Sequence, residues 1–115
     1  MTFDEYQAAA MQTANPDLDV YYALAKLTVE AAEALQLHCK EEYHHKMYER
    51  PTMVEELGDV LWNLALAAQL LGMSLDTIAA ANISKLRRRH GESYNAAHYQ
   101  PPMLDDTAAT QEGAR

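Results

Sequence analysis

Apolar residues recur with helical spacing along much of the chain. Between residues 17 and 45 the intervals alternate between four and three residues, which is the period of an amphipathic helix. The positions are Val20, Leu24, Leu27, Ala31 and Ala34. The pattern predicts a helix from Asp17 to about His45. No segment shows the alternation of a half-buried strand, so we expect an all-α fold.

Capping residues predict helices on both sides of this one. Thr2 followed three residues later by Glu5 is a capping-box pattern, and Asn15-Pro16 is a turn signal. A short first helix is therefore expected between them. Thr52 is the expected N-cap of another helix, with Glu55 in the capping-box position. This assignment gives Glu55 a structural task that needs no ligand.

The apolar periodicity of the chain ends at Gly91. Gly72 is placed to close the third helix, and Ser74 to cap a fourth that ends at Gly91. Residues 92–115 lack apolar periodicity and contain Pro101-Pro102, so we expect a flexible, partly disordered C-terminal tail. The predicted organisation is one domain over residues 1–91 and a tail over residues 92–115.

Composition and charge narrow the class of protein. A chain of 115 residues with 49% hydrophobic content fits one globular domain. Cys39 is the only cysteine, and the N-terminus lacks a signal-peptide pattern, so a cytoplasmic protein is expected. The most apolar stretch, residues 60–73, is shorter than the roughly 20 residues of a membrane span. A net charge of −8 disfavours binding to nucleic acid.

Two pairs of acids occupy the second and third predicted helices. Glu30 and Glu33 are three residues apart, as are Glu56 and Asp59, so each pair shares a helix face. After residue 60 the third helix is apolar nearly all round, which indicates burial in a bundle or between subunits. Four converging carboxylates would repel one another unless cations bind between them. Mg²⁺ and Mn²⁺ prefer such oxygen ligands.

Three motifs follow one another in the chain: EAAE at 30–33, ELGD at 56–59 after a gap of 22 residues, and NISKLRRRHG at 82–91. Together they resemble the MazG-like nucleoside triphosphate pyrophosphohydrolases over about residues 3–91. The resemblance implies an all-α fold of the four-helix-bundle type. It also implies Mg²⁺-dependent hydrolysis of NTPs or dNTPs to the monophosphate and pyrophosphate.

The resemblance also implies roles for single residues. Glu30, Glu33, Glu56 and Asp59 are the expected metal ligands, with Mg²⁺ as cofactor and Mn²⁺ as a possible substitute. Glu33 or Glu56 is expected to act catalytically by orienting or deprotonating the attacking water. Many members have a glutamate directly before the first motif acid, where this chain has Val29. This departure leaves the number of metal ions open.

The last predicted helix offers groups for a triphosphate. Asn82, Lys85 and Arg89 stand at i, i+3 and i+7, so one helix face can present an amide and two cations. The resemblance favours Asn82 and Lys85 as substrate ligands. Arg87 and Arg88 are better explained as favourable charges at the helix C-terminus.

The helix expected at residues 53–71 is apolar around most of its circumference, more than one small subunit can bury. Three other helices, one of them short, can hardly enclose it on all sides, since small domains bury a limited share of their surface. Members of the resembled family form dimers and tetramers. We therefore expect a homodimer or homotetramer, with a nucleoside triphosphate as the other partner.

Other functions compete with this interpretation. HCKEEYHHKMY at 38–48 pairs Glu41 with His44 and Glu42 with His45 at i, i+3. Di-iron carboxylate bundles use this spacing, but on two helices. His38, Cys39 and His44 would form only part of a zinc site. A non-catalytic helical module that binds nucleotides or proteins is the remaining alternative, although the acids of both motifs are intact.

Overall fold

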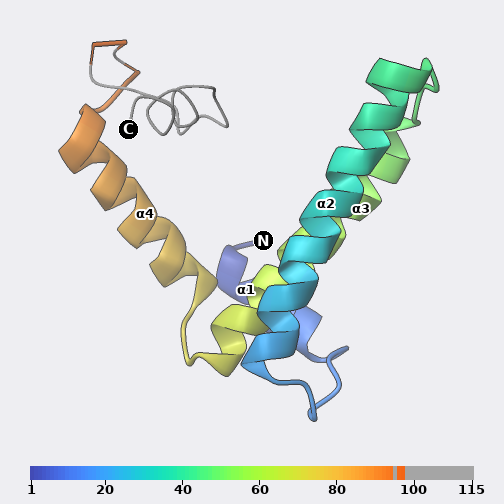
Figure 1. The fold of residues 1–115 in the computed structure, drawn as a ribbon. Coiled ribbons are helices and arrows are strands. Elements are labelled where there is room, and N and C mark those ends of the chain that lie inside the picture. Colours follow the sequence, from blue (N-terminus) through green and yellow to red (C-terminus); the bar gives the residue numbers. More distant parts are fainter. Residues whose placement is uncertain (95, 98–115) are drawn as a thin grey trace, which may run out of the picture. The chain divides into compact units, whose positions relative to one another are not determined.

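The computed structural model describes residues 1–94, 96 and 97. These residues form four α-helices and no strand, as predicted (Figure 1). None of the helices alone is long and apolar enough to cross a membrane. Most of the predicted tail, at 95 and 98–115, lies outside the described residues. The helices are α1 (Phe3–Met11), α2 (Val20–His44), α3 (Arg50–Leu70) and α4 (Leu75–His90).

The first two helices begin at side-chain caps. Thr2 Oγ1 accepts the N–H of Glu5 at 3.1 Å, and the Glu5 carboxylate accepts the N–H of Thr2 at 2.7 Å. Both halves of the predicted capping box are therefore present. Asp19 caps α2 by accepting the N–H of Tyr22 at 2.8 Å. The predicted positions of α1 and α2 are confirmed to within a few residues.

The start of α3 differs from the prediction. The helix begins at Arg50, with Glu49 at the N-cap and no side-chain cap. Pro51 explains the earlier start, because its fixed φ and missing N–H suit the first turn of a helix. Thr52 therefore lies inside the helix, and the predicted capping box with Glu55 is wrong. Glu55 is simply an exposed helical residue.

The predicted stops and the last cap are confirmed. Gly72 has a φ of +71°, and the N–H of Met73 reaches back to the carbonyl of Ala68 at 2.8 Å. This geometry is a Schellman motif, which favours glycine. The Ser74 hydroxyl accepts a backbone N–H from the first turn of α4 at 3.1 Å. Gly91, with a φ of +77°, follows the last residue of α4.

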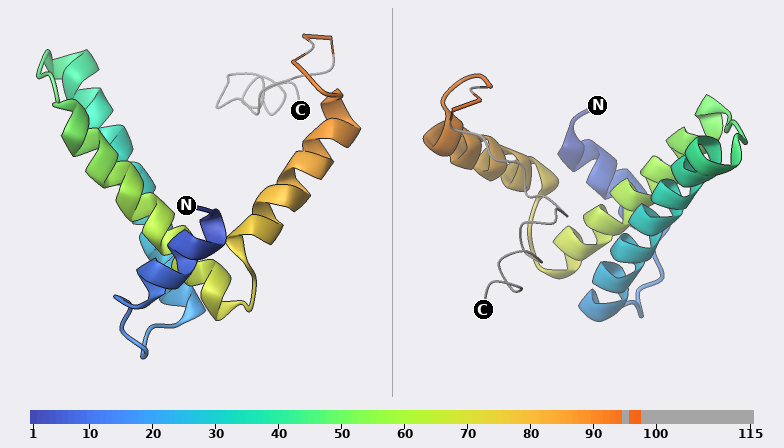
Figure 2. Two further views of the ribbon diagram at one scale, coloured as in Figure 1. Left: turned by 180° about the vertical axis from the view of Figure 1, so that it is seen from behind. Right: turned by 45° about the horizontal axis from the view of Figure 1, so that its top comes forward.

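The structure contains two compact units that meet inside α4, residues 1–80 and residues from 81 onward. In the first unit, α2 and α3 run antiparallel and side by side, and α1 packs on α3 (Figure 2). Much of its core consists of alanine, and Leu66 is the largest fully buried side chain. Small side chains let the helix axes approach closely. The buried apolar residues are Ala10, Ala23, Ala65, Leu66, Ala67, Ala68 and Leu75.

The packed face of α2 is rotated from the one that apolar spacing indicates. Leu24 and Ala31 belong to the predicted apolar face, yet both are exposed. Ala23 is completely buried instead, and Glu30 is mostly buried. Val20, Leu27 and Ala34 of the predicted face are half-buried, so periodicity identified the helix and part of its packed face.

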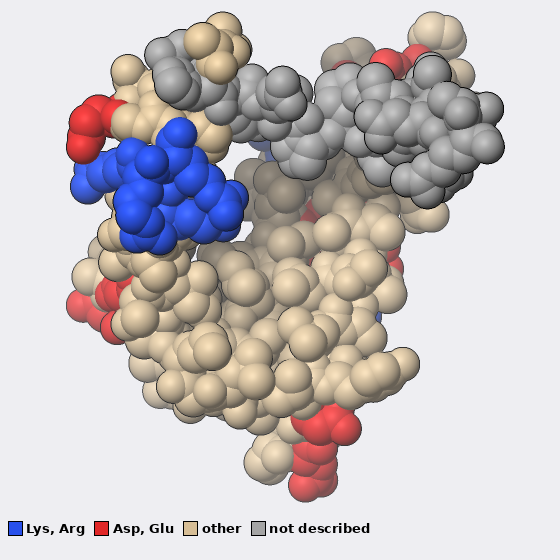
Figure 3. All heavy atoms as spheres, turned by 60° about the vertical axis from the view of Figure 1, so that its left-hand side comes forward, with Lys and Arg blue, Asp and Glu red and all other residues tan. Residues whose placement is uncertain are grey.

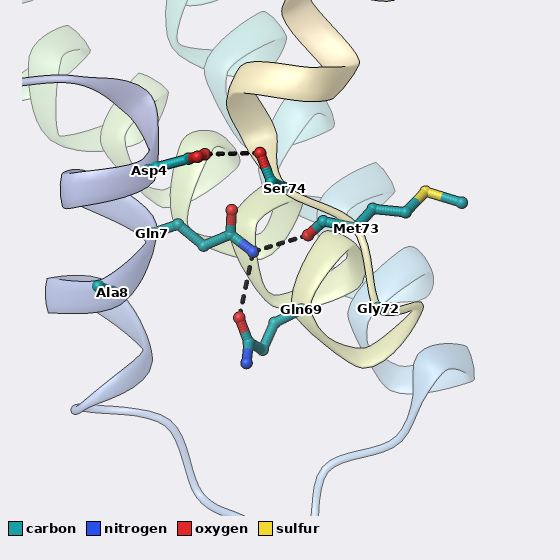
Figure 4. Close-up of a pocket in the computed structure, with 7 residues that line it drawn as sticks. All are labelled: Asp4, Gln7, Ala8, Gln69, Gly72, Met73 and Ser74. Carbon is teal, nitrogen blue, oxygen red and sulfur yellow. Dashed lines mark hydrogen bonds between the residues drawn. The ribbon is translucent and has the colours of Figure 1, made fainter.

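Gln7 connects α1 to the turn between α3 and α4 (Figure 4). The side chain is buried, and its Nε2 donates to Gln69 Oε1 at 3.1 Å and to the Met73 carbonyl at 3.0 Å. Its Oε1 accepts the N–H of Leu75 at 2.8 Å. One side chain therefore contacts the Gln69 side chain of α3 and satisfies two backbone groups after Gly72, including an N–H at the start of α4.

Asp4 adds a second link between the same segments. Its carboxylate accepts the N–H of Asp76 at 3.0 Å and the hydroxyl of Ser74 at 2.8 Å. These hydrogen bonds, the backbone one first, hold the pKa of Asp4 below its usual value. A negative charge at this end of α4 also suits the helix dipole.

We expect Gln7→Ala to lower the free energy of unfolding by about 3 kcal/mol, because it leaves a buried N–H and a carbonyl without partners. Urea denaturation followed by circular dichroism measures this loss. Gln12→Ala, at an exposed position just after α1, is the control and should change stability little. Equal losses in the two variants would contradict the role assigned to Gln7.

Candidate metal centre

The antiparallel pairing of α2 and α3 gathers three acids from the two predicted pairs. One carboxylate oxygen each of Glu30, Glu33 and Glu56 lies within 4.8 Å of the others. Within the described part of the chain, this is the one group of three or more Asp, Glu, His or Cys side chains close enough to hold a metal ion. Two acids come from consecutive turns of α2, and the third comes from the facing helix.

Burial differs sharply among the three acids. Glu30 is 8% exposed, Glu56 is half-buried and Glu33 is exposed. Glu56 Oε2 is buried without a hydrogen-bond partner. A carboxylate oxygen in that position is costly unless a donor or cation meets it. The cluster is therefore shielded from solvent at Glu30 and open to solvent at Glu33.

The charges of the cluster are unevenly compensated. Lys26 Nζ lies 2.9 Å from Glu30 Oε1, and this hydrogen bond keeps the pKa of Glu30 below its usual value. Hydrogen bonding to Glu30, and then the charge of Glu30, raise the pKa of Glu33. The charge of Glu56 adds to this effect. Of the two acids on α2, Glu33 consequently takes up a proton more readily than Glu30 when no metal ion is present.

Asp59 does not belong to the group of three. It is exposed on α3, one turn after Glu56. With Glu30 it borders a hollow of about 350 Å³ next to the cluster. The hollow is lined by Tyr22, Lys26, Glu30, Asp59, Trp62 and Asn63.

Two α3 residues of this hollow are held in fixed positions. The Trp62 indole N–H donates to Thr13 Oγ1 at 2.9 Å. Asn63 is only 4% exposed, and its Nδ2 donates to the carbonyl of Asp59 at 2.9 Å. Asn63 Oδ1 remains buried without a partner. Beside the carboxylates there is thus a positioned aromatic ring and an unpaired acceptor.

Sequence reasoning missed Lys26, Tyr22 and Trp62. The spacing of Lys26 from Glu30, i to i+4, is a recognised pattern for helical ion pairs and was the available signal. The two aromatic residues carried no such signal, because their place depends on how α2 and α3 meet.

The predicted substrate ligands lie in the second unit. Asn82, Lys85 and Arg89 are all exposed on α4 at the expected i, i+3 and i+7 positions. Figure 3 shows lysines and arginines gathered in one group, and Arg87–Arg89 lie in the last turn of α4. Arg87 forms an ion pair with Glu92 at 3.3 Å. Convergence of Asn82, Lys85 and Arg89 with the carboxylates stays a prediction.

The histidine-rich segment forms no comparable centre among the described residues. His38 instead faces Glu42, with 3.5 Å between Nε2 and the carboxylate, and Tyr48, with 3.3 Å between Nδ1 and the hydroxyl. Neither the zinc set nor the Glu-x-x-His pairs come together as a group of three ligands. These polar side chains lie near the exposed ends of α2 and α3, where their presence needs no metal ion to account for it.

Comparison with known families identifies the family of the chain. The model of the MazG nucleotide pyrophosphohydrolase domain matches residues 21–93. The chain belongs to the MazG family. The matched region of this MazG protein runs from the start of α2 past the end of α4 and holds every predicted site residue. The chain matches no curated protein and no solved structure.

The carboxylates of the MazG domain suit a hard divalent ion. Oxygen ligands about 2.1 Å from Mg²⁺ lie about 3 Å apart when adjacent and about 4 Å apart when opposite. The three clustered oxygens, within 4.8 Å of one another, are compatible with such a shell. The unpaired Glu56 Oε2 supplies an acceptor that lacks any protein donor.

We expect Glu56→Gln to abolish Mg²⁺-dependent activity and weaken Mg²⁺ binding at least about tenfold, as ligand-shell changes commonly do. Glu55→Gln is the matched control, because it removes the same charge from the preceding residue of α3, which is exposed. The control should alter stability by no more than about 0.5 kcal/mol. Calorimetric titration and a hydrolysis assay measure both effects. Loss in Glu55→Gln with retention in Glu56→Gln would refute the ligand assignment.

Proposed function

We propose that this protein is a Mg²⁺-dependent nucleoside triphosphate pyrophosphohydrolase that converts an NTP or dNTP to the monophosphate and pyrophosphate. The observation that carries the proposal is the convergence of three carboxylates, from Glu30, Glu33 and Glu56, at the junction of two helices. Membership of the MazG family supports the same reaction class.

The metal centre is proposed to use Glu30, Glu33 and Glu56, with Asp59 as a further ligand from the next turn of α3. Mn²⁺ is a possible substitute for Mg²⁺, because both ions prefer carboxylate oxygen. A bound divalent ion would neutralise phosphate charge and lower the pKa of a coordinated water.

The reaction needs a positioned base rather than a covalent nucleophile. Water attacks the α-phosphorus, a P–O bond to water forms, and the P–O bond to the pyrophosphate leaving group breaks. The proton lost by the water passes to a carboxylate, for which Glu33 and Glu56 are the candidates.

The substrate is proposed to contact two kinds of polar group. Asn82, Lys85 and Arg89 offer an amide and two cations to the phosphate chain. The hollow of about 350 Å³ beside Glu30 and Asp59 has a volume in the range of small-ligand pockets.

We expect the monophosphate and pyrophosphate to appear together as the first products when a panel of NTPs and dNTPs is incubated with Mg²⁺. Anion-exchange chromatography at early times identifies them, and a chelator should stop the reaction. Early release of inorganic phosphate with a nucleoside diphosphate would contradict cleavage at the α-phosphorus.

The same domain is proposed to act as a homodimer or homotetramer. Leu57 and Leu64 lie on α3, and Leu71 directly follows it; at intervals of seven residues, the three share one face. They are 54%, 36% and 50% exposed, which is unusual for aligned leucines. A second copy of the chain would cover this leucine stripe.

We expect sedimentation at micromolar concentration to give a mass at least twice that of the 12.9 kDa chain. Replacing both Leu57 and Leu64 by Glu should shift the protein toward monomer, because charges would face each other across the apolar contact. Activity should fall with this dissociation. A folded and fully active wild-type monomer would refute the proposed assembly.

A further inference from the structure

Lys26 is a basic residue placed directly on the carboxylate cluster. Among the ion pairs of the described residues, its pair with Glu30 is the one that involves a clustered acid. The side chain of Lys26 is 36% exposed and that of Glu30 is 11% exposed. Such a partly buried pair is screened less than a surface pair.

The ammonium group of Lys26 serves more than one acid. It lies 2.9 Å from Glu30 Oε1, and the charge of Glu33 also acts on it. The same side chain lines the hollow that Asp59 borders. Lys26 therefore supplies positive charge where the proposed metal ion would supply it.

We propose that Lys26 is the built-in counter-cation of the metal-free centre, which holds Glu30 until a divalent ion displaces it. The proposal rests on the metal centre of the proposed function. In the metal-free protein the ammonium offsets the charge of the most buried acid, so the cluster can form before metal arrives. Metal and ammonium then compete for one carboxylate, and Lys26 lowers the affinity for the ion.

This competition has a thermodynamic signature. Removing the ammonium should destabilise the metal-free fold, because Glu30 is left buried and unpaired. It should leave the metal-saturated fold nearly unchanged, because the ion then occupies the place of the ammonium. By linkage, the difference between the two states appears as tighter metal binding.

Lys26→Met is the test variant, and Lys40→Met is its matched control. Both remove one positive charge from α2, but Lys40 is exposed and lies 14 residues further along the helix, at a distance of about 21 Å. Calorimetric titration with Mg²⁺ and with Mn²⁺ gives the affinities. Thermal unfolding without metal and at saturating metal gives the stabilities.

The expected result is a metal dissociation constant at least about threefold lower in Lys26→Met than in Lys40→Met, as the loss of a competing ion pair predicts. The metal-free melting temperature should be lower in Lys26→Met, and the two variants should melt together at saturating metal.

Unchanged or weaker metal binding in Lys26→Met would overturn the proposal. Tighter binding without loss of metal-free stability would also overturn it, since general charge repulsion would then suffice. Failure of the wild-type protein to bind either ion would overturn the metal centre as well. Binding by the wild type with no effect of Lys26→Met would refute the counter-cation alone.

Discussion

Repulsion among carboxylates at the junction of α2 and α3 is the constraint on which the rest of the site depends. Three acids share a space in which their oxygens approach within 4.8 Å, and the most buried of them is 8% exposed. Such an arrangement persists only if charge is removed or compensated. The ion pair of Lys26 and the raised pKa of Glu33 each provide part of this compensation. A divalent cation bound between the three carboxylates would compensate their charge by itself.

The alanine-rich core makes this proximity possible. Ala23 on α2 and Ala67 on α3 are almost entirely buried in one core cluster, and their small side chains let the two backbones approach closely. Bulkier side chains at these positions would separate the helices and with them Glu30 and Glu56. The same small core leaves several leucines of α3 exposed, which is the apolar surface that we propose a second chain covers. The carboxylate cluster and the proposed assembly would thus share one origin, the small side chains between the helices.

Local signals predicted most of the fold, and contacts between distant segments account for most of what was missed. Thr2, Gly72 and Ser74 mark helix ends through short-range hydrogen bonds, which a sequence displays directly. The acid pairs likewise follow from spacing within one helix. Asp59 shared a face with Glu56, yet whether its carboxylate joins the cluster depends on the rotation of α3 against α2. The prediction of a Thr52 cap was wrong because a neighbouring residue, Pro51, has the stronger effect on where α3 begins.

The hydrogen bonds of Gln7 have a consequence for synthesis of the chain. Its partners lie 62 to 68 residues further along, at Gln69, Met73 and Leu75. During translation the N-terminal helix therefore leaves the ribosome well before any of those groups exists. Until residue 75 has emerged, α1 exposes its buried amide and apolar side to water or to chaperones. Only then can the hydrogen bonds of Gln7 be completed, and one of them satisfies the N–H at the start of α4.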